Sequence, residues 1–223
     1  MLEQFRQDMT DVQDDVVKTM RDLLSVTQQA VDALIEGDEA AAQAIIDGDD
    51  RFDEMALSID ERVLELIATQ SPVARDLRFL LSMAFIAMYQ ERIADMASGI
   101  AKAARRTARK QVPQPLIDLI KAQANLVYRV MDATRDALEK RDLDQALKLP
   151  ELDEPVDSLN KQFYRELGRL TDEDEIEAAS KMVLSARLLE RIADNCIDVG
   201  ERLAYLITGE RDLLADVEAA MHD

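Results

Sequence analysis

Cysteine, histidine and tryptophan are nearly missing from this chain of 223 residues, which has one cysteine, one histidine and no tryptophan. The single cysteine, Cys196, excludes a disulfide within the chain and is typical of a protein from a reducing compartment. The single histidine, His222, lies in the tail. A Ser-His-Asp or Cys-His catalytic group, or a di-iron site with two Glu-x-x-His motifs, is therefore excluded from the body of the protein. The sequence has no glycine-rich phosphate loop either, so it supplies few residues for catalysis.

Glycine (6), proline (5) and aromatic residues (4%) are also scarce, which leaves little material for hairpin turns and favours helices. The longest uncharged apolar run, residues 79–90, is too short to cross a bilayer, so no membrane insertion is expected. Residues 1–8 are polar and do not resemble a secretory signal. Together these features predict a cytoplasmic protein.

Basic residues are outnumbered, and the formal net charge is −19. Binding to nucleic acid needs a basic surface that matches the phosphate backbone, so this function is disfavoured. Direct binding to an anionic membrane is disfavoured for the same reason. The charge is compatible with binding a cation or a basic partner protein.

Helical periodicity and capping residues predict an all-α protein. Gly48 is expected to kink the second helix, and Ser71-Pro72 to cap the third. Because the connections are short, two tandem, pseudo-symmetric three-helix bundles of antiparallel helices are expected, in residues 1–110 and in residues 111–223 with a short tail. The six predicted helices span about residues 3–35, 38–68, 71–108, 115–140, 142–170 and 172–208.

The sequence E-R-I-A-D occurs twice, at residues 91–95 and 190–194. Each copy places a glutamate and an aspartate four residues apart, on one face of a helix. This repetition, after a shift of 99 residues, indicates that one half of the chain duplicates the other. Matching the preceding helices as well, with a shift of 100, places Asp53 opposite Asp153.

The repeated acidic pairs predict two metal sites. Like charges on neighbouring turns repel each other, and a multivalent cation that bridges them reverses this cost. The alternative is a solvated acidic face in which Arg92 and Arg191 form surface ion pairs. The candidate ligands are Glu91, Asp95, Glu190 and Asp194, with Asp198 extending the second copy, and Asp49, Asp53, Asp60, Asp153 and Asp157 on the preceding helices.

Several segments, in order along the chain, resemble the PhoU family, bacterial regulators of phosphate uptake and phosphate signalling. The resemblance covers almost the whole chain. It departs from the family at Ala94 and Ala193, where glycine is frequent, and at Ala56, where relatives can carry an acid. The segments that carry it are residues 59–61 (I-D-E), 71–78 (S-P-V-A-R-D-L-R), 91–95, 186–194 and 207–210 (I-T-G-E).

The resemblance implies a non-enzymatic adaptor between the ATPase of a phosphate ABC transporter and a phosphate-sensing histidine kinase. It also implies a homodimer and metal clusters of iron or zinc at the acidic motifs, with manganese or magnesium as alternatives. Two other interpretations of the residues stay open. One is a metal-storage protein that binds many ions, and the other is a helical scaffold whose acids only solvate the surface.

Overall fold

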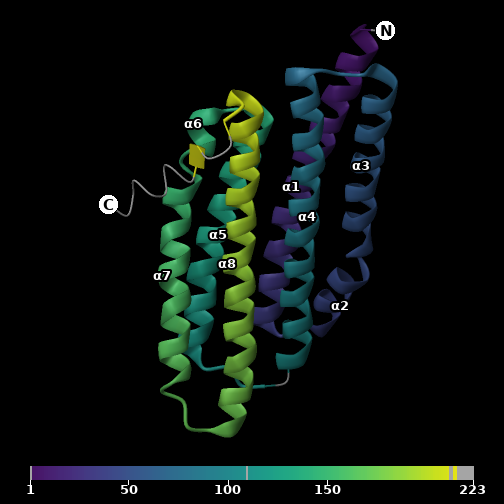
Figure 1. The fold of residues 1–223 in the computed structure, drawn as a ribbon. Helices are drawn as coiled ribbons and strands as arrows, with labels where there is room; N and C mark the ends of the chain where they lie inside the picture. Colours follow the sequence, from purple (N-terminus) through teal and green to yellow (C-terminus); the bar gives the residue numbers. More distant parts are fainter. Residues whose placement is uncertain (1, 109, 211–212, 215–223) are drawn as a thin grey trace.

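A computed structural model describes residues 2–108, 110–210 and 213–214 of the chain. These residues form helices and no strand, which confirms the predicted all-α class. Figure 1 shows the long helices side by side in two groups, α1 to α4 and α5 to α8. The eight helices are α1 (Leu2–Glu36), α2 (Glu39–Asp47), α3 (Asp50–Gln70), α4 (Ala74–Thr107), α5 (Gln114–Lys140), α6 (Leu143–Ala146), α7 (Leu149–Leu167) and α8 (Glu173–Thr208).

Helix ends follow the capping residues in the sequence. The Asp38 carboxylate accepts hydrogen bonds from the backbone N–H groups of Ala40 and Ala41, each at 2.9 Å, and begins α2. Asp172 caps the first turn of α8 in the same way. Gly209, with a φ of 86°, ends α8 in a left-handed conformation that glycine adopts without strain.

Both predicted second helices of the bundles are broken. Gly48 separates α2 from α3, as expected. The range 142–170 is also broken, at residues 147–148, where a continuous helix was predicted. The physical reason is Pro150, which lies in the first turn of α7. Proline has no N–H, and its ring would clash with the carbonyl four residues earlier, at Ala146, where α6 ends.

The predicted role of Ser71 as a helix N-cap is wrong. Ser71 instead closes α3 in a left-handed conformation, with a φ of 49° and its N–H bonded to the Ile67 carbonyl at 3.1 Å. Because the proline at position 72 disfavours a right-handed helical conformation in the residue before it, α3 cannot continue through Ser71. Helix α4 begins only at Ala74.

The two groups of helices share their hydrophobic core. Helix α4 packs along α8, and α1 contacts both α4 and α5. Buried residues from the two halves, such as Ile93 and Ile192, belong to one cluster. At Gly99 a Cβ atom would lie 2.9 Å from Cδ1 of Leu188, so α4 and α8 approach each other too closely there for a larger residue without movement of that leucine. This packing fixes the position of the two acidic helix faces.

The described helices mix apolar and charged side chains. Within them, no segment combines the length and the apolar character needed to cross a bilayer.

Candidate functional site

The first acidic cluster lies between α3 and α4, which form an antiparallel pair. Asp49 precedes α3 and Asp53 follows one turn later, while Glu91 and Asp95 are one turn apart on α4. Burial raises the pKa of Glu91, and the charges of Asp95 and Asp53 raise it further. Burial also raises the pKa of Asp49, and the charge of Asp95 adds to this rise. The four carboxylates therefore act on one another across the two helices.

The second acidic cluster lies between α7 and α8 and is tighter. Asp153, Asp157 and Asp194 each offer one carboxylate oxygen, and these oxygens lie within 4.8 Å of one another. Among the described residues, this is the one group of three acidic, histidine or cysteine side chains with such spacing. Burial, followed by the charge of Asp157, raises the pKa of Asp194.

Glu190 borders the second cluster and is held by two neighbours. Asn160 of α7 donates a hydrogen bond to its carboxylate at 2.5 Å, and Arg187 forms an ion pair with the same oxygen. Burial raises the pKa of Glu190, and Arg187 opposes that rise. Glu190 is thus already partnered by side chains, whereas the three aspartates lie close together beside it.

The structure corrects the register in which the two halves were matched. The charge of Asp53 raises the pKa of Glu91, and the charge of Asp157 raises the pKa of Glu190. Asp53 therefore corresponds to Asp157 and not to Asp153. Asp49 then corresponds to Asp153, after a shift of 104 residues. The change to a shift of 99 falls between α7 and α8, because α7 is shorter at its end than α3. Both clusters therefore pair an Asp-x-x-x-Asp with a Glu-x-x-x-Asp.

Two predicted ligands lie at or beyond the edges of these clusters. Asp60 is two helical turns past Asp53, about 10 Å along the axis of α3, and it lines a groove that also contains several apolar side chains. Asp198 is one turn past Asp194 and its charge raises the pKa of that residue. Asp198 also lines a small pocket with Glu201 and Arg202. Asp60 therefore shares a groove with Asp53 and Glu91 but lies outside the first acidic cluster.

Sequence reasoning missed three polar residues at the clusters, namely Ser98, Asn160 and Arg187. Ser98 and Asn160 are 1% and 7% exposed. A polar residue on the inner face of an amphipathic helix was a signal of polar neighbours, such as the Glu190 carboxylate to which Asn160 donates. Arg187 precedes Glu190 by three residues, which is the spacing of an ion pair on one helix face.

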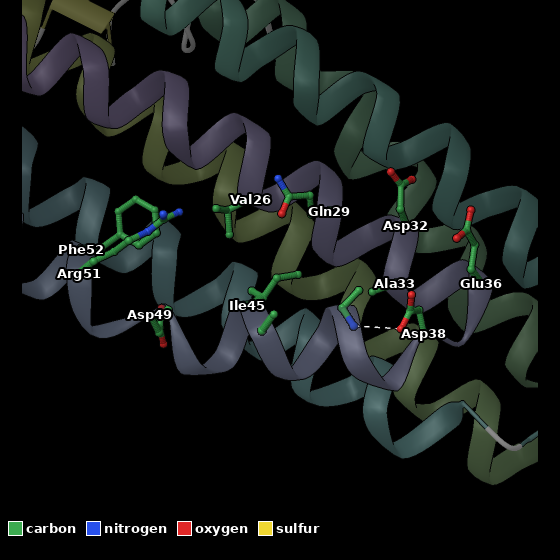
Figure 2. Close-up of a pocket in the computed structure, with 13 residues that line it drawn as sticks. Val26, Gln29, Asp32, Ala33, Glu36, Asp38, Ile45, Asp49, Arg51 and Phe52 are labelled. Carbon is green, nitrogen blue, oxygen red and sulfur yellow. Dashed lines mark hydrogen bonds between the residues drawn. The ribbon is translucent and has the colours of Figure 1, made fainter.

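A separate pocket of about 330 Å³ lies between the end of α1 and the α2–α3 segment (Figure 2). Its wall includes Asp32, Glu36 and Asp38, and Asp49 lies at its edge. The Asp38 carboxylate is engaged in capping α2. Asp49 thus connects this pocket with the first acidic cluster.

Comparison with known proteins identifies a family. The family model described as "PhoU domain" matches residues 16–104 and again residues 120–203. A PhoU homologue from Clostridium acetobutylicum, described as a phosphate-specific transport system accessory protein, is 34% identical over 71% of this chain and 73% of its own. A homologue of the same description from Methanothermobacter thermautotrophicus is 27% identical over 93% of this chain and 95% of its own.

The fold is similar to two solved structures. The crystal structure of PhoU from Pseudomonas aeruginosa has a TM-score of 0.87 and 28% sequence identity, and the match covers 92% of this chain and all of that one. The crystal structure of PhoU from Streptococcus pneumoniae, titled a phosphate transport system regulatory protein, has a TM-score of 0.85 and 25% identity, with 93% and 98% covered.

Proposed function

The chain belongs to the PhoU family, and on that basis we propose that it is a non-enzymatic regulator of phosphate uptake and of phosphate-starvation signalling. The observation that carries the proposal is the full-length match to PhoU proteins, several of them described as accessory proteins of phosphate-specific transport. The lack of histidine outside the tail and of a phosphate-binding loop supports a role without catalysis. We propose that residues 1–110 and 111–223 are the two repeats of this regulator.

The proposed role is that of an adaptor between two partners. One partner is the ATPase of the phosphate ABC transporter, and the other is the phosphate-sensing histidine kinase. We propose that the protein acts in the cytoplasm beside the membrane, as a homodimer. The strongly acidic surface, with a net charge of −19, supports docking on basic protein surfaces and not on nucleic acid.

We further propose that the acidic clusters bind metal ions, the second cluster more tightly. Two oxygens on one ion lie at most twice the metal–oxygen distance apart, or about 4–5 Å for bonds of about 2.0–2.6 Å. The oxygens of Asp153, Asp157 and Asp194, which lie within 4.8 Å of one another, come close to this limit, and small side-chain rotations would bring them to the spacing of a shared ion. Their chemistry, carboxylates alone, suits hard cations such as Mn²⁺, Mg²⁺ or iron better than zinc, which prefers histidine and cysteine in structural sites.

A bound ion would supply positive charge, and the residues themselves would orient and hold it. Asp153, Asp157 and Asp194 would hold it in the second cluster, with Glu190 beside them. In the first cluster Asp49, Asp53, Glu91 and Asp95 would do so with a looser arrangement. The gain comes from relieving repulsion that burial makes costly, since the pKa values of Asp49, Glu91, Glu190 and Asp194 are all raised.

Deleting the gene in its host tests the signalling role. We expect alkaline phosphatase to be derepressed in medium rich in phosphate, and a plasmid copy of the gene to restore repression. A Leu184→Ala copy, changed at an exposed side chain away from both clusters, is the matched control and should also restore it. Unchanged repression in the deletion strain would contradict the proposed role.

Metal analysis of the protein purified without chelator tests the sites separately. The Glu190→Gln/Asp194→Asn variant should contain less metal than the unchanged protein. Equal metal content in both would contradict the second site. A content of many ions per chain, together with normal repression in the deletion strain, would instead support a storage protein.

A further inference from the structure

A groove of about 640 Å³ runs between α3 and α4, on the outer side of the first bundle. Its floor and walls are mostly apolar. Four of its side chains are unusually exposed for their type, namely Leu57 at 62%, Leu81 at 44%, Phe85 at 40% and Met88 at 39%. We call this feature the α3–α4 groove. Its lining residues are Asp53, Ala56, Leu57, Asp60, Leu81, Ala84, Phe85, Met88 and Glu91.

The corresponding face of the second bundle is more polar, although one position keeps an exposed apolar side chain, Leu184 in place of Phe85. In the register that the acidic clusters establish, Leu57 corresponds to Lys161, Leu81 to Ser180 and Met88 to Arg187. Lys161, Ser180 and Arg187 are all exposed, so the second helix pair meets water with side chains that solvate well. The shared helix packing therefore does not require apolar residues at these positions. The exposed apolar surface of the first pair needs another explanation, and contiguous surfaces of this kind mark interaction sites.

Carboxylates surround the apolar lining. Asp53 and Asp60 stand on the α3 side, and Glu91 stands at one end of the α4 side. Beyond Phe85 the surface continues into a small pocket that includes Asp198 and Glu201 of α8. One guanidinium, that of Arg202, lies over the Phe85 ring at 4.1 Å. The rim is thus mainly negative and matches a partner with cations beside its apolar side chains.

The charges also select among occupants. A second copy of this chain, placed on the groove by a two-fold axis, would bring the same carboxylates against one another. An anionic membrane would be repelled by the rim. The lining of α4 from Leu81 to Glu91 extends about 15 Å, or nearly three helical turns. A helix of about ten residues with an apolar stripe and flanking lysines or arginines fits both the length and the charge.

We propose that the α3–α4 groove docks an amphipathic helix of a partner protein whose apolar face is flanked by basic residues. Leu57, Leu81, Phe85 and Met88 supply the apolar contact, and Asp60 pairs with a cation of the partner. Asp53 and Glu91 do the same when the first acidic cluster holds no metal ion. The proposal deepens the adaptor role by giving it a surface. It rests on that role only for the biological identity of the partner.

A labelled peptide of 18 residues tests the groove directly. The peptide has leucines at helical spacing with lysines beside them, and its binding to the full-length protein is followed by fluorescence anisotropy. The key variant is L57K/L81S/M88R, which places the second bundle's residues in the first and should therefore fold. Leu184→Ala, an exposed leucine in the second bundle at the position that corresponds to Phe85, is the matched control.

We expect the key variant to bind the peptide about tenfold more weakly or worse, a loss of about 1.4 kcal/mol or more, and the control to bind it unchanged. Phe85→Ala, a single exposed truncation, should weaken binding in the same direction. A peptide of the same composition in scrambled order should bind weakly to every form. Binding should also weaken as salt rises, since the rim charges are exposed.

Equal binding by the key variant and the unchanged protein would overturn the proposal, and so would equal binding of the scrambled peptide. Self-association of the unchanged protein that the key variant loses would overturn it too, because a second copy would then occupy the groove. The phosphatase assay separates this proposal from the signalling role. Normal peptide binding with unchanged repression in the deletion strain would refute that role and leave the groove intact.

Discussion

We expect Arg187 to limit how strongly the second acidic cluster attracts a cation, and replacing it tests the proposed site. Its guanidinium pairs with Glu190, beside Asp153, Asp157 and Asp194. It therefore repels an incoming ion and also occupies a possible ligand. Arg187→Met introduces the side chain that the first bundle carries at the corresponding position, so the helix should accept it.

The magnitude follows from the exposure of the pair. The Arg187 side chain is 49% exposed, and surface charge pairs are worth about 0.2–1 kcal/mol. A divalent ion doubles the charge, which gives about 0.4–2 kcal/mol of repulsion removed. A value near 1 kcal/mol corresponds to about fivefold tighter binding. The change also raises the pKa of Glu190, because Arg187 lowers it, so both proteins are titrated at the same pH of about 7.5.

Isothermal titration of chelator-treated protein with Mn²⁺ measures the effect. We expect the dissociation constant of Arg187→Met to fall by about fivefold relative to the unchanged protein. Arg169→Met is the matched control, since Arg169 forms an ion pair of the same three-residue spacing with Glu166, away from both clusters. Unchanged or weaker Mn²⁺ binding by Arg187→Met, or an equal gain in the control, would refute the reasoning.

Three further results are expected. Glu190→Gln/Asp194→Asn should melt above the unchanged protein at pH 7 without metal, by about 2–4 °C for each kcal/mol of repulsion removed. In the folded protein the pKa values of Glu190 and Asp194 are raised above their unfolded pKa values of 4.5 and 3.8. These groups therefore stabilise the fold below their unfolded pKa values and lose this contribution as the pH rises through their folded pKa values. The melting temperatures of the two proteins should therefore converge near pH 4. Melting temperatures that differ equally at pH 4 and pH 7 would contradict this. Asp157→Asn should weaken Mn²⁺ binding more than Asp53→Asn, as measured by the same titration, and the reverse order would contradict the ranking of the clusters. Gly200→Ala should destabilise the protein by about 1–3 kcal/mol, because its Cβ would meet a buried leucine methyl group of α7 at 2.6 Å; an unchanged denaturant midpoint would show that α7 can shift at little cost.

The helices were predictable because their apolar periodicity and caps act locally. The Asp38 and Asp172 caps and the stop at Gly209 follow from neighbouring residues alone. Pro150 was visible in the sequence, and its clash with the carbonyl four residues earlier was the missed signal for the break before α7. Ser71 was ambiguous, since the same residue type favours the start of one helix and tolerates the end of another.

The acidic residues were predictable as sets, but their grouping in space was not. Spacing of four places Glu190 and Asp194 on one face of α8. Which turn of α7 faces them depends on the length of the loop and on where each helix ends, and these differ between the bundles. The sequence match therefore made Asp53 equivalent to Asp153, whereas in the structure Asp53 occupies the position in the first bundle that Asp157 occupies in the second. The partner Asn160, which reaches Glu190 from α7, emerges only once that register is known. Arg187 lies three residues before Glu190 on α8 itself, so its pairing was a local signal.

Anomalous X-ray diffraction from crystals of the protein grown with Mn²⁺ tests most directly whether the carboxylates of α7 and α8 form a cation site. We predict an anomalous peak bounded by Asp153, Asp157 and Asp194, stronger than any peak at Asp49, Asp53, Glu91 and Asp95. The peak should disappear in Glu190→Gln/Asp194→Asn crystals grown in the same way. A peak confined to the first cluster, or no peak at either cluster at saturating Mn²⁺, would contradict the proposed site.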